Sequence, residues 1–188
     1  AGSGIIGCGK ISGIYVQNLT NGKWPGVKLV ACSDLRAERA QDLADANPGV
    51  TAQSIEELLA NPDVDIVLNL TIPGAHFPLA MDTITAGKHH YSEKPMTLRA
   101  DEANELLRKA EARGVRLGCA PDTFLGSGIQ TARQAIADGC IGKPVAVMGH
   151  FLNRGPERWH PDPAFYYQEG GGPLFDMGPY YITAMIAM

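Results

Sequence analysis

Two glycines near the beginning of the chain stand at the spacing of a phosphate-binding turn. Gly7 and Gly9 follow a short apolar run, and Ser12 comes three residues later, where a helical pattern starts. Such a turn places a pyrophosphate against the unpaired amides at the start of the helix. Asp34 ends the next apolar run, where a carboxylate accepts hydrogen bonds from the ribose hydroxyls of an adenosine. This pattern predicts a dinucleotide site, and the alternative is a tight turn that binds no ligand.

The charges at Asp34 and Arg36 bear on which dinucleotide binds. A carboxylate at Asp34 repels a 2′-phosphate and so favours NAD. The guanidinium of Arg36, two residues later, would attract that phosphate and favour NADP. We therefore expect NAD, with NADP as the alternative. A purely structural alternative is that Asp34 caps the helix that follows it.

A lysine follows a later predicted strand directly, in the tripeptide Glu93-Lys94-Pro95. Ligands of open α/β sheets bind beyond the carboxyl ends of the strands, so the Lys94 ammonium is expected near a bound nicotinamide. There it would hydrogen-bond a substrate hydroxyl and stabilise charge that develops on its oxygen. A cis bond between Lys94 and Pro95, which proline makes accessible, would aim the side chain into the cleft. The alternative is a solvated surface lysine.

Asp176 and Tyr180 stand four residues apart in the last helical pattern of the chain. On one continuous helix, residues four apart share a face. A tyrosine can donate and accept a proton, but its reference pKa of about 10 suits neutral pH only if a nearby cation lowers that pKa. Lys94 is the expected cation. The structural alternatives are a core aromatic at Tyr180 and an acid that pairs near the helix start at Asp176.

The elements that must position these groups alternate regularly up to Pro121. The alternation of short apolar runs with helical patterns predicts a doubly wound parallel sheet in residues 1–121. Expected strands cover residues 4–6, 27–32, the neighbourhood of Val50, 65–70, 89–92 and 115–120; expected helices cover 10–19, 37–47, a stretch from the capping box at Ser54, 75–86 and 101–113.

The pattern changes in residues 122–188. A helix over 129–137, a strand over 144–152, a polar and aromatic loop and a helix from about Pro173 are predicted there. One strand and two helices cannot bury a core, so we expect an incomplete second α/β domain and a fragment of a longer protein. Asp122, at the start of this part, is expected near the cleft. Trp159, which lies between Arg158 and His160, suits a polyhydroxylated ligand.

Composition bounds the function of the chain. The 188 residues carry a net charge of −4 and are 45% hydrophobic and 19% charged, as in soluble globular proteins. The acidic balance gives no electrostatic footprint for nucleic acid. No apolar stretch approaches the ~20 residues that cross a bilayer, and no leader pattern is present, so we expect a cytoplasmic protein without a membrane partner. The four cysteines and five histidines lack metal-ligand spacing, so no metal site is expected.

These motifs together resemble the glucose–fructose oxidoreductase / inositol dehydrogenase (Gfo/Idh/MocA) family, along essentially the whole chain. The resemblance implies a Rossmann domain followed by an α/β domain with a large open, mostly antiparallel sheet that often makes oligomer contacts. It rests on the stretches 5–11, 63–67, 71–76, 86–89, 93–95, 139–142 and 170–178, with Glu93-Lys94-Pro95 and the glycine triplet before Asp176 as the specific elements.

The resemblance also implies an activity and residue roles. Family members move a hydride between a nicotinamide cofactor and a hydroxyl carbon, usually of a sugar, polyol or related ring. Lys94 then lies beside both reactants, and Asp176 and Tyr180 complete the catalytic set, where many members carry histidine in place of this tyrosine. The expected substrate contacts are Lys94, Asp122, Trp159, Asp176 and Tyr180. The expected cofactor contacts are Gly7, Gly9, Lys10, Ile11, Asp34, Arg36, Thr71, Ile72, Pro73, His76, Glu93 and Lys94.

Two other functions stay open at this point. Some relatives hydrolyse glycosidic bonds with tightly held NAD, through a transient oxidation without net redox change. A few relatives have become non-catalytic proteins that sense the cofactor, and the absence of the usual histidine at Tyr180 favours this possibility. The full-length protein is expected to form a homo-oligomer in each case.

Overall fold

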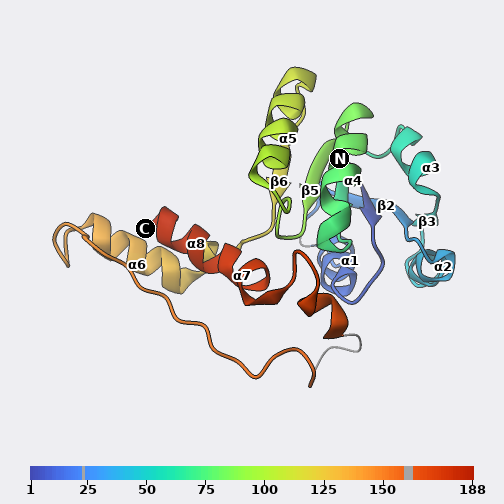
Figure 1. Ribbon diagram of the computed structural model, residues 1–188. Helices are drawn as coiled ribbons and strands as arrows, with labels where there is room; N and C mark the ends of the chain where they lie inside the picture. Colours follow the sequence, from blue (N-terminus) through green and yellow to red (C-terminus); the bar gives the residue numbers. More distant parts are fainter. Residues whose placement is uncertain (23, 159–162) are drawn as a thin grey trace. The chain divides into compact units, whose positions relative to one another are not determined.

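The computed structural model describes residues 1–22, 24–158 and 163–188. By their internal contacts these residues form two compact units, Ala1–Cys119 and Ala120–Met188 (Figure 1). No helix in these described ranges is long and apolar enough to cross a bilayer.

The first unit is built on one six-stranded sheet in which every pairing is parallel. The strand order is β3-β2-β1-β4-β5-β6, so the order reverses between β1 and β4. Crevices form at such a reversal, beyond the carboxyl ends of the strands. The doubly wound prediction is therefore confirmed. The strands are β1 (Gly2–Ile6), β2 (Lys28–Ser33), β3 (Thr51–Ala52), β4 (Ile66–Asn69), β5 (His89–Ser92) and β6 (Leu117–Cys119).

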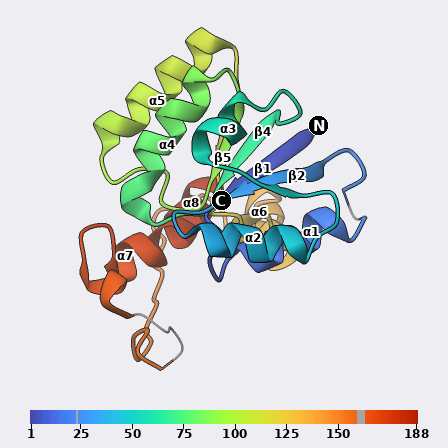
Figure 2. The same ribbon diagram turned by 90° about the vertical axis from the view of Figure 1, so that its right-hand side faces the viewer.

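Helices cover both faces of this sheet. Figure 2 shows α4 and α5 on one side and α1 and α2 on the other. Ile5 and Ile6 on the central strand point to opposite faces, and each joins a separate buried cluster. Burial on both faces explains the nearly continuous apolar run of residues 65–70. The helices are α1 (Ser12–Thr20), α2 (Ala37–Asp45), α3 (Ile55–Ala60), α4 (Pro73–Thr85) and α5 (Ala100–Arg113).

A buried lysine fixes the connection between α3 and β4. The Nζ of Lys88, which is 9% exposed, donates to the carbonyl oxygens of Asn61 at 2.7 Å and Val64 at 2.6 Å. Burial lowers the pKa of this ammonium, and the nearby carboxylate of Asp65 raises it. The two hydrogen bonds to carbonyl oxygens compensate the ammonium for the water molecules that it loses on burial.

The second unit consists of helices joined by irregular chain. They are η1 (Thr123–Leu125), α6 (Ser127–Ala137), η2 (Pro163–Tyr167), α7 (Gly172–Asp176) and α8 (Gly178–Ala187). The strand expected over residues 144–152 is wrong: this stretch is irregular, and Val145 and Leu152 are each 93% exposed. A strand requires a neighbour that pairs its amides and carbonyls, and no described segment pairs with this one. The open antiparallel sheet of this part stays a prediction.

The single helix expected from about Pro173 is also wrong, because it is interrupted. α7 ends at Asp176, Met177 separates the two helices, and α8 begins at Gly178. Pro179 lies in the first turn of α8, where its missing amide costs nothing. In the middle of a continuous helix the same proline would remove a hydrogen bond and clash with the preceding turn. Pro179 is therefore compatible with the start of a new helix and not with the middle of a continuous one.

His90 makes the stability of the first unit depend on pH. Its side chain is 2% exposed, and its ring nitrogens have no partner among the described residues. Burial, followed by the charge of His76, lowers its pKa from 6.5 to about 4. The unfolded chain therefore binds the proton more readily between pH 6.5 and about 4, so the folded state loses stability as pH falls through this window.

We expect the free energy of unfolding to fall by about 3 kcal/mol between pH 7 and pH 4 because of His90. Urea unfolding at a series of pH values measures this slope. His90→Leu removes the proton-binding group without breaking a side-chain hydrogen bond within the described residues and should flatten the slope. His150→Gln, at an exposed position, is the matched control and should keep it. An unchanged slope in His90→Leu would contradict the assignment.

Candidate functional site

The glycine turn lies at the carboxyl end of β1, where the strand order reverses. Gly7 has a φ of +100°, a conformation that side chains with a Cβ rarely adopt. A Cβ there would also lie 2.8 Å from the backbone of Leu70, at the end of the neighbouring β4. The amide of Gly7 donates to the carbonyl of Ser33 at 2.8 Å. Gly7 is therefore required by backbone conformation and by the close approach of two strands.

Gly9 has a different reason to lack a side chain. A Cβ at this position would meet nothing within 4 Å, so the space in front of the turn is open. Ile11 stands at the N-cap of α1 and offers no side-chain acceptor to the first helical amides. An open approach to the start of a helix that has no side-chain cap fits the pyrophosphate of a dinucleotide. Ser12, in the place of the usual third glycine, turns its Oγ back to donate to the Gly9 carbonyl at 2.7 Å.

Asp34 joins the end of β2 to the glycine turn. Its Oδ2 accepts from the amide of Cys8 at 2.7 Å, and its Oδ1 accepts from the amide of Arg36 at 2.8 Å. The second contact resembles the capping alternative, although Arg36 itself is the N-cap residue of α2. A carboxylate has about four acceptor positions, so two remain for ribose hydroxyls. The fixed position of this charge suits that role.

The thiol of Cys8, within the turn, stays in its neutral form. A hydrogen bond with the Cys32 side chain is the largest cause that raises its pKa above the ordinary value, followed by burial. The nearby carboxylate of Asp34 raises it further. This environment disfavours the Cys8 thiolate, whose charge would repel a pyrophosphate.

Exposed apolar side chains flank this edge of the sheet. Leu35, directly after Asp34, is 99% exposed, and Ile72, after β4, is 67% exposed. Flat aromatic rings such as adenine pack against apolar side chains in ligand sites. Sequence reasoning predicted a cofactor contact at Ile72 and did not single out Leu35, which is exposed beside Asp34. The available signal was an apolar residue in a polar turn immediately after the acid.

The remaining predicted cofactor residues lie around the same edge. Lys10 and Ile11 are exposed between the glycine turn and α1, and Arg36 is exposed after Asp34. Pro73 begins α4. Thr71 donates from its Oγ1 to Oδ1 of the buried Asn69 at 2.6 Å. This part of the loop after β4 is therefore held by side-chain contacts.

Lys94 follows β5 at the same edge. The amide of Glu93 donates to the carbonyl of Asn69 at 2.9 Å, which extends the pairing of β5 with β4. The amide of Lys94 donates to Oε2 of Glu93 at 3.1 Å, and the Lys94 side chain is half-buried. The bond between Lys94 and Pro95 is cis, as predicted. The lysine thus leaves the sheet two strands away from the glycine turn.

His76 is buried beneath this segment instead of lining an open surface. It is 1% exposed. Its Nδ1 lies 2.6 Å from the carbonyl oxygen of Pro95, and its Nε2 lies 3.1 Å from that of Thr71. Both neighbours are acceptors, and a neutral imidazole has one N–H, so the ring donates to one of them; the shorter contact assigns that proton to Nδ1 and the hydrogen bond to the Pro95 carbonyl. These contacts are made within the protein and do not correspond to the direct cofactor contact expected for His76.

The predicted catalytic pair lies in the second unit. Asp176 ends α7 and Tyr180 belongs to α8, so the expectation that they share one helix face is wrong. Both side chains are half-buried. The charge of Asp176 helps raise the pKa of the buried Tyr166, for which burial is the first cause. Tyr166 is a neighbour of Asp176 that sequence reasoning missed, since it lies ten residues earlier in the chain, in η2.

Two other predicted substrate residues are placed as follows. Asp122 is exposed at the N-cap of η1. Trp159 lies outside the described residues.

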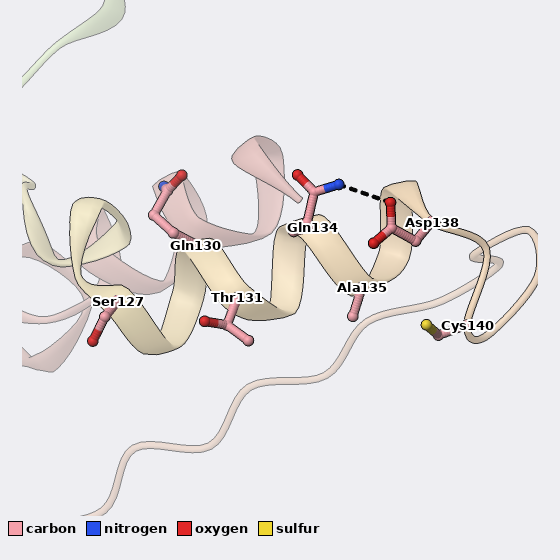
Figure 3. Close-up of a pocket in the computed structure, with 7 residues that line it drawn as sticks. All are labelled: Ser127, Gln130, Thr131, Gln134, Ala135, Asp138 and Cys140. Carbon is pink, nitrogen blue, oxygen red and sulfur yellow. Dashed lines mark hydrogen bonds between the residues drawn. The ribbon is translucent and has the colours of Figure 1, made fainter.

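A separate hollow runs along α6, as Figure 3 shows. The amide of Gln134 donates to Oδ1 of Asp138 at 2.7 Å across one side of it. This hollow offers no cluster of chemically reactive groups, and the described residues contain no group of three or more His, Cys, Asp or Glu that would hold a metal ion. Its lining residues are Ser127, Gln130, Thr131, Gln134, Ala135, Asp138 and Cys140.

Comparison with known proteins agrees with this geometry. A family model described as the oxidoreductase family with an NAD-binding Rossmann fold matches residues 2–120. A second model, described as the GFO/IDH/MocA C-terminal domain, matches residues 129–188. The solved structure of GenD2 from gentamicin A biosynthesis, in complex with NAD, is similar with a TM-score of 0.82 at 25% identity, over 99% of this chain and 52% of that one.

Curated relatives are similar over much of the chain. The 1,5-anhydro-D-fructose reductase of Ensifer adhaerens is 33% identical over 144 residues, which are 76% of this chain and 43% of the relative. The myo-inositol 2-dehydrogenase of Thermotoga maritima is 27% identical over 175 residues, 93% of this chain and 50% of the relative. The chain thus spans about half the length of the curated relatives it matches. With its glycine turn, its Lys94 segment and a family model that matches residues 2–120, the chain belongs to the Gfo/Idh/MocA family of oxidoreductases.

Proposed function

We propose that this protein is an NAD-dependent dehydrogenase that oxidises a hydroxyl-bearing carbon of a sugar, polyol or cyclic alcohol, or reduces the matching ketone. The observation that carries this proposal is the convergence of the open glycine turn and the Lys94 segment at one edge of the sheet. The names of the relatives, a 1,5-anhydro-D-fructose reductase and a myo-inositol 2-dehydrogenase, support a polyhydroxylated substrate.

Each residue has a role in this proposal. The bound nicotinamide supplies the group that accepts or donates the hydride. The amides at the start of α1 bind the pyrophosphate, and Asp34 binds the ribose. The Lys94 ammonium hydrogen-bonds the substrate oxygen and stabilises negative charge there as the C–H bond breaks. Tyr180 exchanges the hydroxyl proton and Asp176 orients the substrate.

NAD is the proposed cofactor because of where the charges lie. The Asp34 carboxylate is held by two backbone amides, so it cannot turn away from an incoming 2′-phosphate. Arg36 is exposed, and its contact with Asp34 is made by its backbone amide. That contact does not restrain the guanidinium group. A fixed anion opposes NADP more strongly than a solvated cation favours it.

Lys94→Ala should lower kcat by about 10²–10⁴-fold, because the substrate oxygen loses its charged hydrogen-bond donor. NAD binding should stay within a few-fold of the wild-type protein. NADH formation by the full-length protein on a panel of polyols measures the first effect, and NADH fluorescence titration measures the second. Lys28→Ala, at the opposite end of the sheet, is the control and should keep full turnover. Wild-type turnover in Lys94→Ala would sink the proposed role.

Asp34→Asn should raise the Kd for NADH about tenfold and lower the Kd for NADPH, because it removes the charge but keeps an acceptor for the Cys8 amide. Titration of both reduced cofactors by fluorescence measures the change in preference. Asp63→Asn, an exposed change at the other end of the sheet, should leave both constants alone. Equal NAD affinity in Asp34→Asn and wild type would exclude ribose binding by this carboxylate.

The same polyol panel separates the alternatives that the family allows. Release of a sugar from a glycoside without build-up of NADH would indicate a hydrolase that uses NAD transiently. Tight NAD binding with no turnover of either substrate class would indicate a cofactor sensor, in keeping with Tyr180 in place of the usual histidine.

A further inference from the structure

We propose that His76 and Tyr15 are positioning residues that hold the Lys94 segment from two sides. This inference rests on the proposed role of Lys94 and deepens it. His76 acts through the carbonyl of Pro95, and Tyr15 acts through the carboxylate of Glu93. Their recorded hydrogen bonds run to the protein itself, on either side of the lysine.

The His76 ring lies between the loops that follow two neighbouring strands. Thr71 follows β4 and Pro95 follows β5, and the ring lies between their carbonyl oxygens at 3.1 and 2.6 Å. A carbonyl oxygen carries no proton, so the shorter contact requires a proton on Nδ1. Because the ring is 1% exposed, water does not compete for these acceptors. The backbone on the carboxyl side of Lys94 is thereby fixed to α4.

The Tyr15 contact fixes the backbone on the amino side. The hydroxyl of Tyr15 donates to Oε1 of Glu93 at 2.8 Å, while Oε2 of the same carboxylate accepts from the Lys94 amide at 3.1 Å. Tyr15 lies in the first turns of α1, the helix whose start faces the proposed pyrophosphate position. The carboxylate therefore links the dinucleotide-binding helix to the lysine through two hydrogen bonds.

A third contact, from the end of β6, restrains the same segment. The thiol of Cys119 lies 3.8 Å from the Glu93 carbonyl oxygen. Contacts from α1, α4 and β6 thus surround a tripeptide whose lysine is the proposed electrostatic catalyst. Displacement of a catalytic group by about 1 Å costs roughly 10²-fold in rate, so such restraint matters for turnover more than for ligand binding.

Three variants of the full-length protein test the proposal. His76→Leu removes both contacts of the ring, whereas His76→Asn places an amide donor close to the position of Nδ1 and keeps the bond to Pro95. Tyr15→Phe removes only the hydroxyl. We expect His76→Leu and Tyr15→Phe to lower kcat about 10–100-fold with KM and the Kd for NADH within about threefold, and His76→Asn to recover most of kcat.

A readout that needs no turnover accompanies the kinetics. Hydrogen exchange of the peptide around residues 93–97, followed by mass spectrometry, should accelerate in His76→Leu and Tyr15→Phe and stay close to wild type in His76→Asn. The rate of reductive methylation of the Lys94 amine should change in the same order. If His76→Leu does not fold, as thermal unfolding would reveal, Tyr15→Phe against wild type provides the same two measurements.

The outcomes separate this proposal from the one on which it rests. The wild-type protein could show no Lys94-dependent turnover while hydrogen exchange of residues 93–97 accelerates in the variants as expected. The positioning roles of His76 and Tyr15 would then stand, and the dehydrogenase assignment would fall. If turnover depends on Lys94 while His76→Leu and Tyr15→Phe keep wild-type kcat and exchange, the positioning roles are overturned. A fall in kcat that His76→Asn does not rescue, without faster exchange, also overturns them, because the loss then has another cause.

Discussion

The parallel pairing of β1 with β4 is the constraint on which the rest of the site depends. It brings the turn after β1 against the backbone of Leu70 so closely that only glycine fits at position 7. The same pairing, continued through β5, delivers Lys94 to the edge where the glycine turn lies. Neither group would be near the other without this register, because they are far apart in the sequence.

Much of the first unit was predictable from sequence because its signals are local. Apolar runs, glycine stops and the capping box of Ser54 and Glu57 each report on a few neighbouring residues. The same holds for the glycine turn and Asp34, whose spacing is set by one strand–helix–strand unit. The second unit was predicted less well. Its expected strand depends on a partner that the described residues do not supply, and its last helix is interrupted near Pro179.

The contacts that sequence could not predict are long-range. Tyr15 and Glu93 are joined across most of the first unit, and Lys88 reaches carbonyls before β4. Nothing in the local pattern around either residue distinguishes such a contact from a solvated side chain. His76 shows the same limit, since its place in a motif suggested a ligand contact and the fold turns its ring toward two backbone carbonyls. Tertiary packing decided each of these cases.

Gly7 and Gly9 are constrained for different reasons. At position 7 a methyl group collides with the neighbouring strand, so any replacement harms the folding of this chain. At position 9 the same methyl group meets only empty space in the protein, so folding tolerates it. Drift at position 7 is therefore blocked by the chain's own architecture, while drift at position 9 is opposed only as long as the protein keeps a use for a dinucleotide.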